Sequence, residues 1–291
     1  MTVLPSVAAG TAARLGIVHS TGFRYPGTVV TSYNEARMTP LTTPWQTTLE
    51  ARLEVSPQAS TYRYWDYWGT QVTAFDVRPR HDRLTVTARS VVETFSPPAP
   101  TVSDVGWEAL RAPATLDRYA ELLAPTPRTE PGEPAMEQVR ERVAGVAPAA
   151  TGERVCAWVS EVMDYVPGAT GVHTSAEEAW AVRKGVCQDM AHVAVGVLRR
   201  LGVPARYVSG YLLPRADLPV GETVRGESHA WVEWWAGEWQ AWDPTNGRRV
   251  GPDHVLVGRG RDYDDVPPLR GVYAGPGGGE LFVSVEFTRL A

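Results

Sequence analysis

Hydrophobic and polar residues alternate along several short segments in the first third of the chain, as they do in strands that bury one face. Prolines and glycines, which interrupt regular backbone structure, separate these segments. The strands are expected at residues 17–18, 28–31, 48–55, 72–77 and 84–88. Short alternating strands joined by frequent turns predict a β-rich, sandwich-like N-terminal domain over residues 11–96, after a tail at residues 1–10.

The pattern changes after a proline-rich stretch at residues 96–100, because apolar residues then recur at steps of three and four. We expect short helices at 115–123 and 137–143, and assign residues 97–150 to a proline-rich linker that carries them. A further helix is expected to start at Thr151, whose hydroxyl can cap it.

The best-defined helix is predicted over residues 187–201, where Met190, Ala194 and Val197 share one face. Gly202 marks its C-terminal end. Alternating segments at 205–212, 228–235, 239–242 and 281–287 then predict strands. Helices followed by an antiparallel sheet define an α+β unit, which we place at residues 151–291 with the C-terminal strands included.

Composition and charge exclude several classes of partner. The chain has 291 residues, of which 43% are hydrophobic, and a formal net charge of −5. A nucleic-acid partner is not expected, because neutralising phosphates needs a basic face. No apolar run is long enough for a membrane span, and residues 1–10 lack the features of a secretory signal. We therefore expect no membrane association and a cytoplasmic location with reduced thiols.

Only two cysteines are present, too few for a disulfide scaffold or, alone, for a structural zinc site. Cys156 lies in an apolar helical run and is best interpreted as a packing residue. Cys187 begins the best-defined helix, where the positive end of the helix dipole and the nearby Lys184 favour a thiolate. A small buried side chain is the alternative for this position.

A hairpin rich in tryptophan lies downstream of Cys187. Five of the eleven tryptophans fall within residues 231–242, around an expected turn at 236–238. Antiparallel pairing would place residue 229 opposite residue 243, to within about two positions, and bring His229 beside Asp243. A carboxylate next to an imidazole is the orienting pair of a nucleophilic triad, although a salt-linked surface pair is the simpler alternative. With Cys187 added, the chemical interpretation becomes the stronger one.

Three blocks of sequence resemble the transglutaminase-like superfamily: residues 185–192 (GVCQDMAH), 228–233 (SHAWVE) and 242–245 (WDPT). Residues 19–25, 34–40 and 77–84 are similar to the N-terminal region that precedes this core in bacterial members, and residues 258–268 to their C-terminal segment. The resemblance implies a papain-like core with Cys187 as nucleophile, His229 as base and Asp243 as the residue that orients it. The backbone N–H of Cys187 is then the candidate oxyanion donor.

The function implied is that of a cofactor-free thiol enzyme that attacks protein or peptide amides and forms a thioester. Hydrolysis is the favoured outcome; transfer to an amine, and a catalytically idle binding protein, are the alternatives. The tryptophans could exclude water and favour an amine, but a core role is commoner. No metal is expected, since Cys187, Asp189 and His192 lack a fourth ligand and the acidic run at 262–265 is interpreted as a solvated loop. The oligomeric state is left open.

Overall fold

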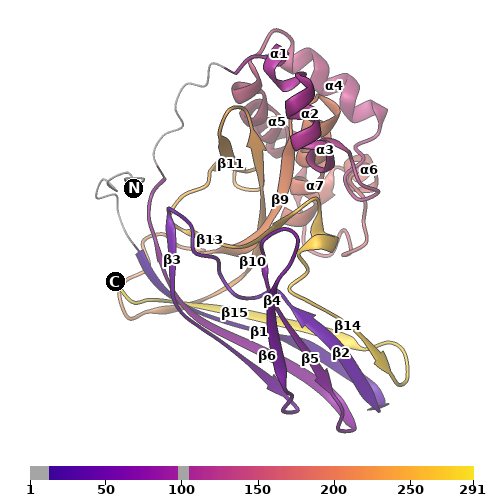
Figure 1. Ribbon diagram of the computed structural model, residues 1–291, viewed down its shortest axis with the longest axis vertical. Helices are drawn as coiled ribbons and strands as arrows, with labels where there is room; N and C mark the ends of the chain where they lie inside the picture. The colour runs from indigo at the N-terminus through magenta and orange to yellow at the C-terminus, as the bar shows by residue number, and fades with distance from the viewer. Residues whose placement is uncertain (1–12, 98–104) are drawn as a thin grey trace.

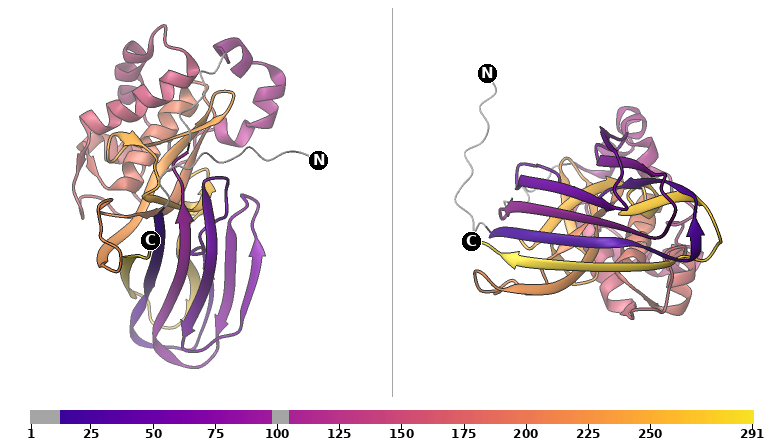
Figure 2. Two further views of the ribbon diagram at one scale, coloured as in Figure 1. Left: turned by 90° about the vertical axis from the view of Figure 1, so that its left-hand side faces the viewer. Right: turned by 90° about the horizontal axis from the view of Figure 1, so that it is seen from below.

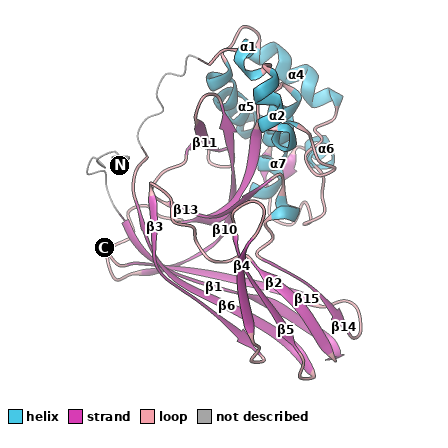
Figure 3. Ribbon diagram, in the orientation of Figure 1, coloured by secondary structure: helices cyan, strands magenta, loops and turns pink. Residues whose placement is uncertain are grey.

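The computed structural model describes residues 13–97 and 105–291, so the tail predicted at residues 1–10 and most of the proline-rich stretch lie outside the described residues. Helices gather at one end of the molecule, and long strands form the other end (Figures 1 and 3). None of the described helices is long and apolar enough to cross a membrane.

The N-terminal region is a series of antiparallel strands. These are β1 (Ala13–Val29), β2 (Thr31–Ala36), β3 (Gln46–Ser56), β4 (Thr61–Trp65), β5 (Gln71–Val77) and β6 (His81–Thr94). Alternate residues of β1, from Leu15 through Ile17 and His19 to Thr21, are buried, because side chains of a strand point to opposite faces in turn. The period-two pattern therefore predicted the β-rich character correctly, while the strands are longer than expected.

Two sheets face each other in this region. One has the strand order β14 (Leu269–Ala274), β2, β5, β4; the other contains β15 (Glu280–Arg289), β1, β6 and β3 in that order. Phe75 and Val77 of the first sheet pack with Leu84 and Val86 of the second in one apolar cluster. The expected sandwich is confirmed by this shared core.

The C-terminal strands belong to these sheets, which corrects their placement in the unit at residues 151–291. Strand β15 pairs with β1 from Leu15↔Arg289 to Arg24↔Glu280, and β14 pairs with β2. An alternating pattern shows only that one face of a strand is buried. It does not identify the partner strand, which here lies more than 200 residues away in sequence.

The helical part lies between the two halves of the sandwich in sequence. Its helices are α1 (Trp107–Leu110), α2 (Pro113–Arg118), α3 (Ala120–Leu123), α4 (Glu133–Val143), α5 (Pro148–Val162), α6 (Ala176–Val182) and α7 (Cys187–Arg200). Leu110 and Met136 are buried in the main apolar core, so the stretch assigned to a linker is in large part packed structure. Helix α5 begins at Pro148 rather than at Thr151, whose hydroxyl instead donates to the Ala147 carbonyl (3.0 Å).

Helix α7 is the centre of the helical core. Residues 188–199 are all buried, whereas the sequence pattern had indicated one apolar face. The difference arises because α4, α5 and α6 cover α7 on the sides that do not face β9 and β10. The helix ends before Gly202, whose φ of 82° is the left-handed conformation expected of a C-terminal glycine.

Strand β10 (Thr223–Trp235) joins the two parts of the molecule (Figure 2). Its first residues, Thr223 to Gly226, pair with β15, and its later residues pair with β9 and β11. The remaining strands are β7 (Asp164–Tyr165), β8 (Lys184–Gly185), β9 (Ala205–Leu212), β11 (Trp239–Asp243), β12 (Arg248–Arg249) and β13 (His254–Gly260), with a 3₁₀ turn η1 at Tyr263–Asp265. One long strand therefore carries His229 and connects the sandwich to the helical core.

Candidate active site

Cys187 is the first residue of α7, as the sequence predicted, and its side chain is partly buried. The start of the helix is held by Asp189, whose Oδ2 accepts the Val186 backbone N–H (2.8 Å) and the Thr170 hydroxyl (2.6 Å). A Cβ at Gly185 would lie only 2.6 Å from Asp189 Cβ, so the lack of a side chain there lets the carboxylate reach the helix start. These contacts place the thiol at the N-terminal end of a rigid, buried helix.

His229 and Asp243 lie side by side, one on β10 and the other at the end of β11. His229 Nε2 donates to Asp243 Oδ2 over 2.8 Å. The hairpin pairs Val232 with Trp242 and Trp235 with Trp239, which lies within the two positions allowed by the prediction. The expected imidazole–carboxylate contact forms, and it is buried rather than on the surface, since Asp243 is inaccessible to solvent.

The Asp243 carboxylate is held by its own turn as well as by His229. Its Oδ1 accepts the backbone N–H groups of Thr245 (3.0 Å) and Asn246 (3.2 Å), and its Oδ2 accepts the Asn246 side-chain amide (2.7 Å). An aspartate followed by proline commonly starts such a side-chain-capped turn, so the Asp243-Pro244 dipeptide is a local sequence signal for this turn. Asn246 is therefore a site residue that the sequence analysis missed.

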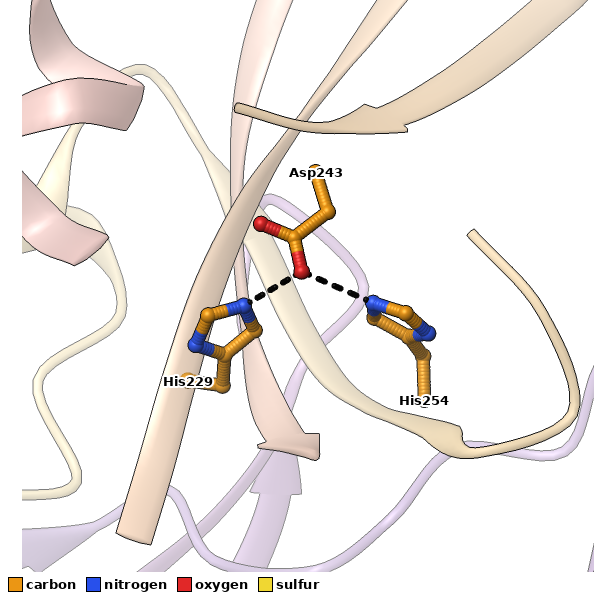
Figure 4. Close-up of side chains that lie close together, drawn as sticks. All are labelled: His229, Asp243 and His254. Atoms are coloured by element: carbon orange, nitrogen blue, oxygen red, sulfur yellow. Dashed lines mark hydrogen bonds and ion pairs between the residues drawn. The ribbon is translucent and has the colours of Figure 1, made fainter. Parts of the chain in front are cut away.

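A second histidine, His254, contacts the same carboxylate oxygen and was also missed. Its Nε2 lies 3.1 Å from Asp243 Oδ2, on the other side from His229 (Figure 4). Its Nδ1 lies 3.0 Å from Asp253 Oδ1, and Asp253 in turn forms an ion pair with Arg248. His254 begins β13 with no local motif around it, so only the fold could reveal this contact.

The electrostatics of the pair follow from these contacts. Burial acts to lower the pKa of His229, but the hydrogen bonds and charges of Asp243 and Cys187 outweigh it and raise that pKa to about 9. Burial likewise opposes ionisation of Asp243, yet hydrogen bonds from His229, His254 and Asn246 hold its pKa well below the usual range. Because His229 Nε2 is engaged by Asp243, Nδ1 is the ring nitrogen left for the Cys187 thiol. The three predicted residues are thus brought together.

The other candidate residues have structural surroundings. Cys156 is fully buried, which raises the pKa of its thiol well above the ordinary value, as expected of a packing residue. His192 is buried, which lowers its pKa to about 3, and its Nε2 accepts the Tyr263 backbone N–H (3.1 Å). Asp189 is hydrogen-bonded at the helix start. Asp189 and His192 are therefore both engaged in structural contacts and are not arranged with Cys187 as metal ligands.

One group of described residues has the donor atoms of a metal site: His229, Asp243 and His254, whose nearest ligand atoms lie within 4.8 Å of one another. The Nε2–Oδ2 separations of 2.8 and 3.1 Å are hydrogen-bond lengths, in which each ring donates a proton to the carboxylate. A cation would have to displace both protons, so the arrangement is that of a hydrogen-bonded chain.

Two of the five hairpin tryptophans pack into cores, and the other three, Trp235, Trp239 and Trp242, are partly buried. Trp231 and Trp234 are buried, and the Trp234 indole N–H donates to the Ala149 carbonyl (3.2 Å). The interpretation of the acidic run as a solvated loop holds for Asp264, which is exposed, but is wrong for Asp262, which is buried and accepts the Asp264 backbone N–H (2.8 Å) to cap η1. A capping turn was not recognisable without the elements that bury it.

Comparison with known proteins identifies relatives of both parts of the chain. The family model described as the bacterial transglutaminase-like N-terminal region matches residues 15–93, and that of the transglutaminase-like superfamily matches residues 138–244. An uncharacterized Mycobacterium leprae protein is 47% identical over 279 residues, covering 96% of this chain and 99% of that protein. An uncharacterized Mycobacterium tuberculosis protein is 33% identical, covering 94% of this chain and 92% of its own length.

Two further similarities concern the fold and the core. The solved structure of a candidate cysteine protease from Cytophaga hutchinsonii superposes with a TM-score of 0.77 at 18% identity, covering 97% of this chain and 92% of that one, which establishes the shared fold. A protein-glutamine gamma-glutamyltransferase of Pseudomonas aeruginosa is 35% identical over 97 residues, which are 32% of this chain and 14% of that protein. The chain therefore belongs to the bacterial transglutaminase-like family, with the family's N-terminal region preceding a transglutaminase-like core.

Proposed function

We propose that the protein is a cysteine-dependent acyl-transfer enzyme that acts on peptide, isopeptide or glutamine side-chain amides. The observation that carries the proposal is the position of His229, which is hydrogen-bonded to buried Asp243 through Nε2 and lies close enough to Cys187, at the start of α7, for that thiol to raise its pKa. A nucleophile beside a base that is itself oriented by a carboxylate is the arrangement that covalent acyl transfer needs.

Each residue has a defined part in the reaction. The Cys187 thiol gives its proton to His229, the sulfur attacks the amide carbonyl, and the carbonyl oxygen becomes negatively charged beside the Cys187 backbone N–H. That N–H belongs to the first turn of α7, where backbone donors have no acceptor within the helix. His229 gives its proton to the leaving nitrogen, the C–N bond breaks, and a thioester remains on Cys187. Asp243 stabilises the imidazolium form of His229 before that transfer.

Resolution of the thioester decides the product. In hydrolysis, which we favour, water loses a proton to His229 and attacks the thioester, which releases a carboxylic acid and restores the thiol. An amine acceptor would follow the same steps and leave a new amide. The similarity of the core to the Pseudomonas aeruginosa protein-glutamine gamma-glutamyltransferase supports this second candidate. Neither route calls for a cofactor.

The first experiment tests whether Cys187 is activated. Native protein, Cys187→Ala and Cys156→Ala are alkylated with a limiting amount of iodoacetamide, and the site is read by peptide mass spectrometry. Cys156 is the matched control, because it is the chain's other cysteine and is fully buried. We expect fast labelling that Cys187→Ala abolishes, Cys156→Ala leaves intact and His229→Gln slows. Labelling of Cys187 no faster than in the unfolded chain would overturn the proposal and favour a non-catalytic binding protein.

The second experiment separates the two outcomes on one sample. A glutamine-bearing protein is incubated with the enzyme and a fluorescent primary amine, with Cys187→Ala as the blank. Ammonia release or chain cleavage without incorporation of the amine supports hydrolysis. Covalent incorporation of fluorescence supports amine transfer and overturns the hydrolytic assignment.

A further inference from the structure

The strongest unassigned feature beside the site is the hydrogen-bonded chain that continues beyond Asp243. It runs from His229 through Asp243 and His254 to Asp253, and ends at Arg248 near the surface. The His254 side chain is fully buried, as is that of Asp243. Buried polar groups are stable only where they have partners, and both nitrogens of the His254 ring have one. Nε2 faces Asp243 Oδ2, and Nδ1 accepts the Gly251 backbone N–H beside Asp253.

Asp243 Oδ2 is the shared point of this chain. It receives protons from the two imidazole Nε2 atoms at 2.8 and 3.1 Å, and the two rings approach it from different sides (Figure 4). Both rings donate to the same oxygen, so they compete for its negative charge. The hydrogen bond from His254 therefore weakens the hydrogen bond from His229. The strength of the His229–Asp243 bond therefore depends on His254.

The position of His254 is itself fixed from three directions. Its Nδ1 lies 3.0 Å from Asp253 Oδ1 and 3.2 Å from the Gly251 backbone nitrogen, and its ring meets Trp231 edge-on at 5.4 Å between centroids. Trp231 also lies beside His229, with 6.3 Å between the ring centroids. These contacts hold the ring so that Nε2 points at the carboxylate.

We propose that His254 is a positioning residue for the proposed reaction: it holds Asp243 from the side away from His229 and limits how strongly Asp243 binds the His229 ring. This inference rests on the proposed function of Cys187, His229 and Asp243. Removing the His254 donor leaves more of the carboxylate's charge to His229, so His229 keeps its proton to higher pH. The groups that face His254 are Asp243, Asp253 and, through Asp253, Arg248. Those that face His229 are Asp243 and Cys187. The two imidazole rings also face each other, with 6.0 Å between their centroids.

The test measures the pH dependence of Cys187 alkylation by iodoacetate. This reagent is an anion, so its reaction with the thiolate is favoured while His229 is an imidazolium and slows as His229 loses its proton. His254→Leu removes the donor, and His254→Gln restores an N–H at the place of Nε2. His81→Leu is the matched control, since His81 is a buried histidine of the sandwich whose Nδ1 contacts the Pro79 carbonyl (2.8 Å).

The alkaline midpoint is the pH at which the alkylation rate has fallen by half as His229 loses its proton. We expect it to rise by about one pH unit in His254→Leu, a roughly tenfold change in the proton affinity of His229. His254→Gln and His81→Leu should keep the native midpoint. The inference is overturned if His254→Leu leaves the midpoint in place, or if the glutamine variant moves it as far as the leucine variant does. Should His254→Leu not fold, His254→Asn takes its place, because its shorter amide can meet Asp253 but does not reach Asp243.

Failure of the proposed function gives a different result. In that case the alkylation rate of native protein does not fall at high pH in a way that His229→Gln abolishes, whatever the residue at position 254. If the rate does fall at high pH and the fall depends on His229 but not on His254, only the positioning role of His254 is refuted.

Discussion

Replacing Asp243 by asparagine tests the electrostatic part of the proposed site, because it removes one charge and changes the side chain very little. The amide oxygen of the substituted side chain can still accept the backbone N–H groups of Thr245 and Asn246, which bond to Oδ1 of the native residue. The turn should therefore persist in Asp243→Asn. What is lost is the negative charge beside His229, in a position that solvent does not reach, together with the Oδ2 acceptor of both imidazole rings, because an amide NH₂ group takes its place.

The expected size of the effect follows from the causes that set the pKa of His229. Burial lowers it, and the hydrogen bond to Asp243 is the largest of the contributions that raise it to about 9. Without that charge we expect the pKa to fall to about the ordinary 6.5. At about pH 7.5 the imidazolium fraction then drops from nearly all of the molecules to about one-tenth, so acylation should slow by at least about tenfold from protonation alone.

The assay is a titration of the His229 ring by ¹⁵N-edited NMR, together with the alkylation rate of Cys187 over the same pH range. His229→Gln identifies the resonance, and thermal unfolding confirms that Asp243→Asn is folded. An alkaline midpoint that moves down from about 9 in both measurements supports the assignment of Asp243. If the His229 resonance of folded Asp243→Asn still titrates near the native midpoint, the carboxylate does not control the base and the reasoning is refuted.

Three further predictions concern residues around the site. Cys156→Ala should leave Cys187 alkylation unchanged and lower the free energy of unfolding by about 1–2 kcal/mol through the lost packing, as urea unfolding would show. Gly185→Ala should slow Cys187 alkylation in a protein that still folds, because the added Cβ pushes away the carboxylate that caps α7; an unchanged rate would show that this cap does not position the thiol. Burial opposes ionisation of Glu233, but Arg259 and Arg206 lower its pKa to about 2, so its stabilising contribution should be present above about pH 4.5 and be lost as the pH falls toward 2. Glu233→Gln should therefore cost about 3–5 kcal/mol at neutral pH and flatten the acid dependence of stability, and equal acid sensitivity in variant and native protein would count against this assignment.

Local sequence signals predicted the parts of the site that are local in structure. Cys187 begins α7, whose apolar run starts directly after Gly185, and His229 meets Asp243 because a short hairpin leaves few registers open. His254 could not be found in this way. It reaches Asp243 through the pairing of β13 with β9, and neither strand specifies in its own sequence which partner it takes. Asn246 lies between these cases, since a turn signal was present in the sequence but its bond to a buried carboxylate required the fold.

The C-terminal strands were misplaced for the same reason, since their own sequence does not specify which strand they pair with. Their actual pairing links the N-terminal region to the site. Strand β10 pairs with β15 from Thr223 to Gly226, and His229 follows only three residues later on the same strand. Strand β15 in turn pairs along β1, so the backbone that carries the base is anchored in the N-terminal sandwich. The backbone of a strand that is paired along its length moves little, because each ladder hydrogen bond also restrains the residues beside it. The thiol is fixed from one side by the buried helix α7, and the base from the other side by a sheet that runs through both regions. The N-terminal region is therefore part of the scaffold that sets the distance between Cys187 and His229, although none of its own residues belongs to the proposed triad.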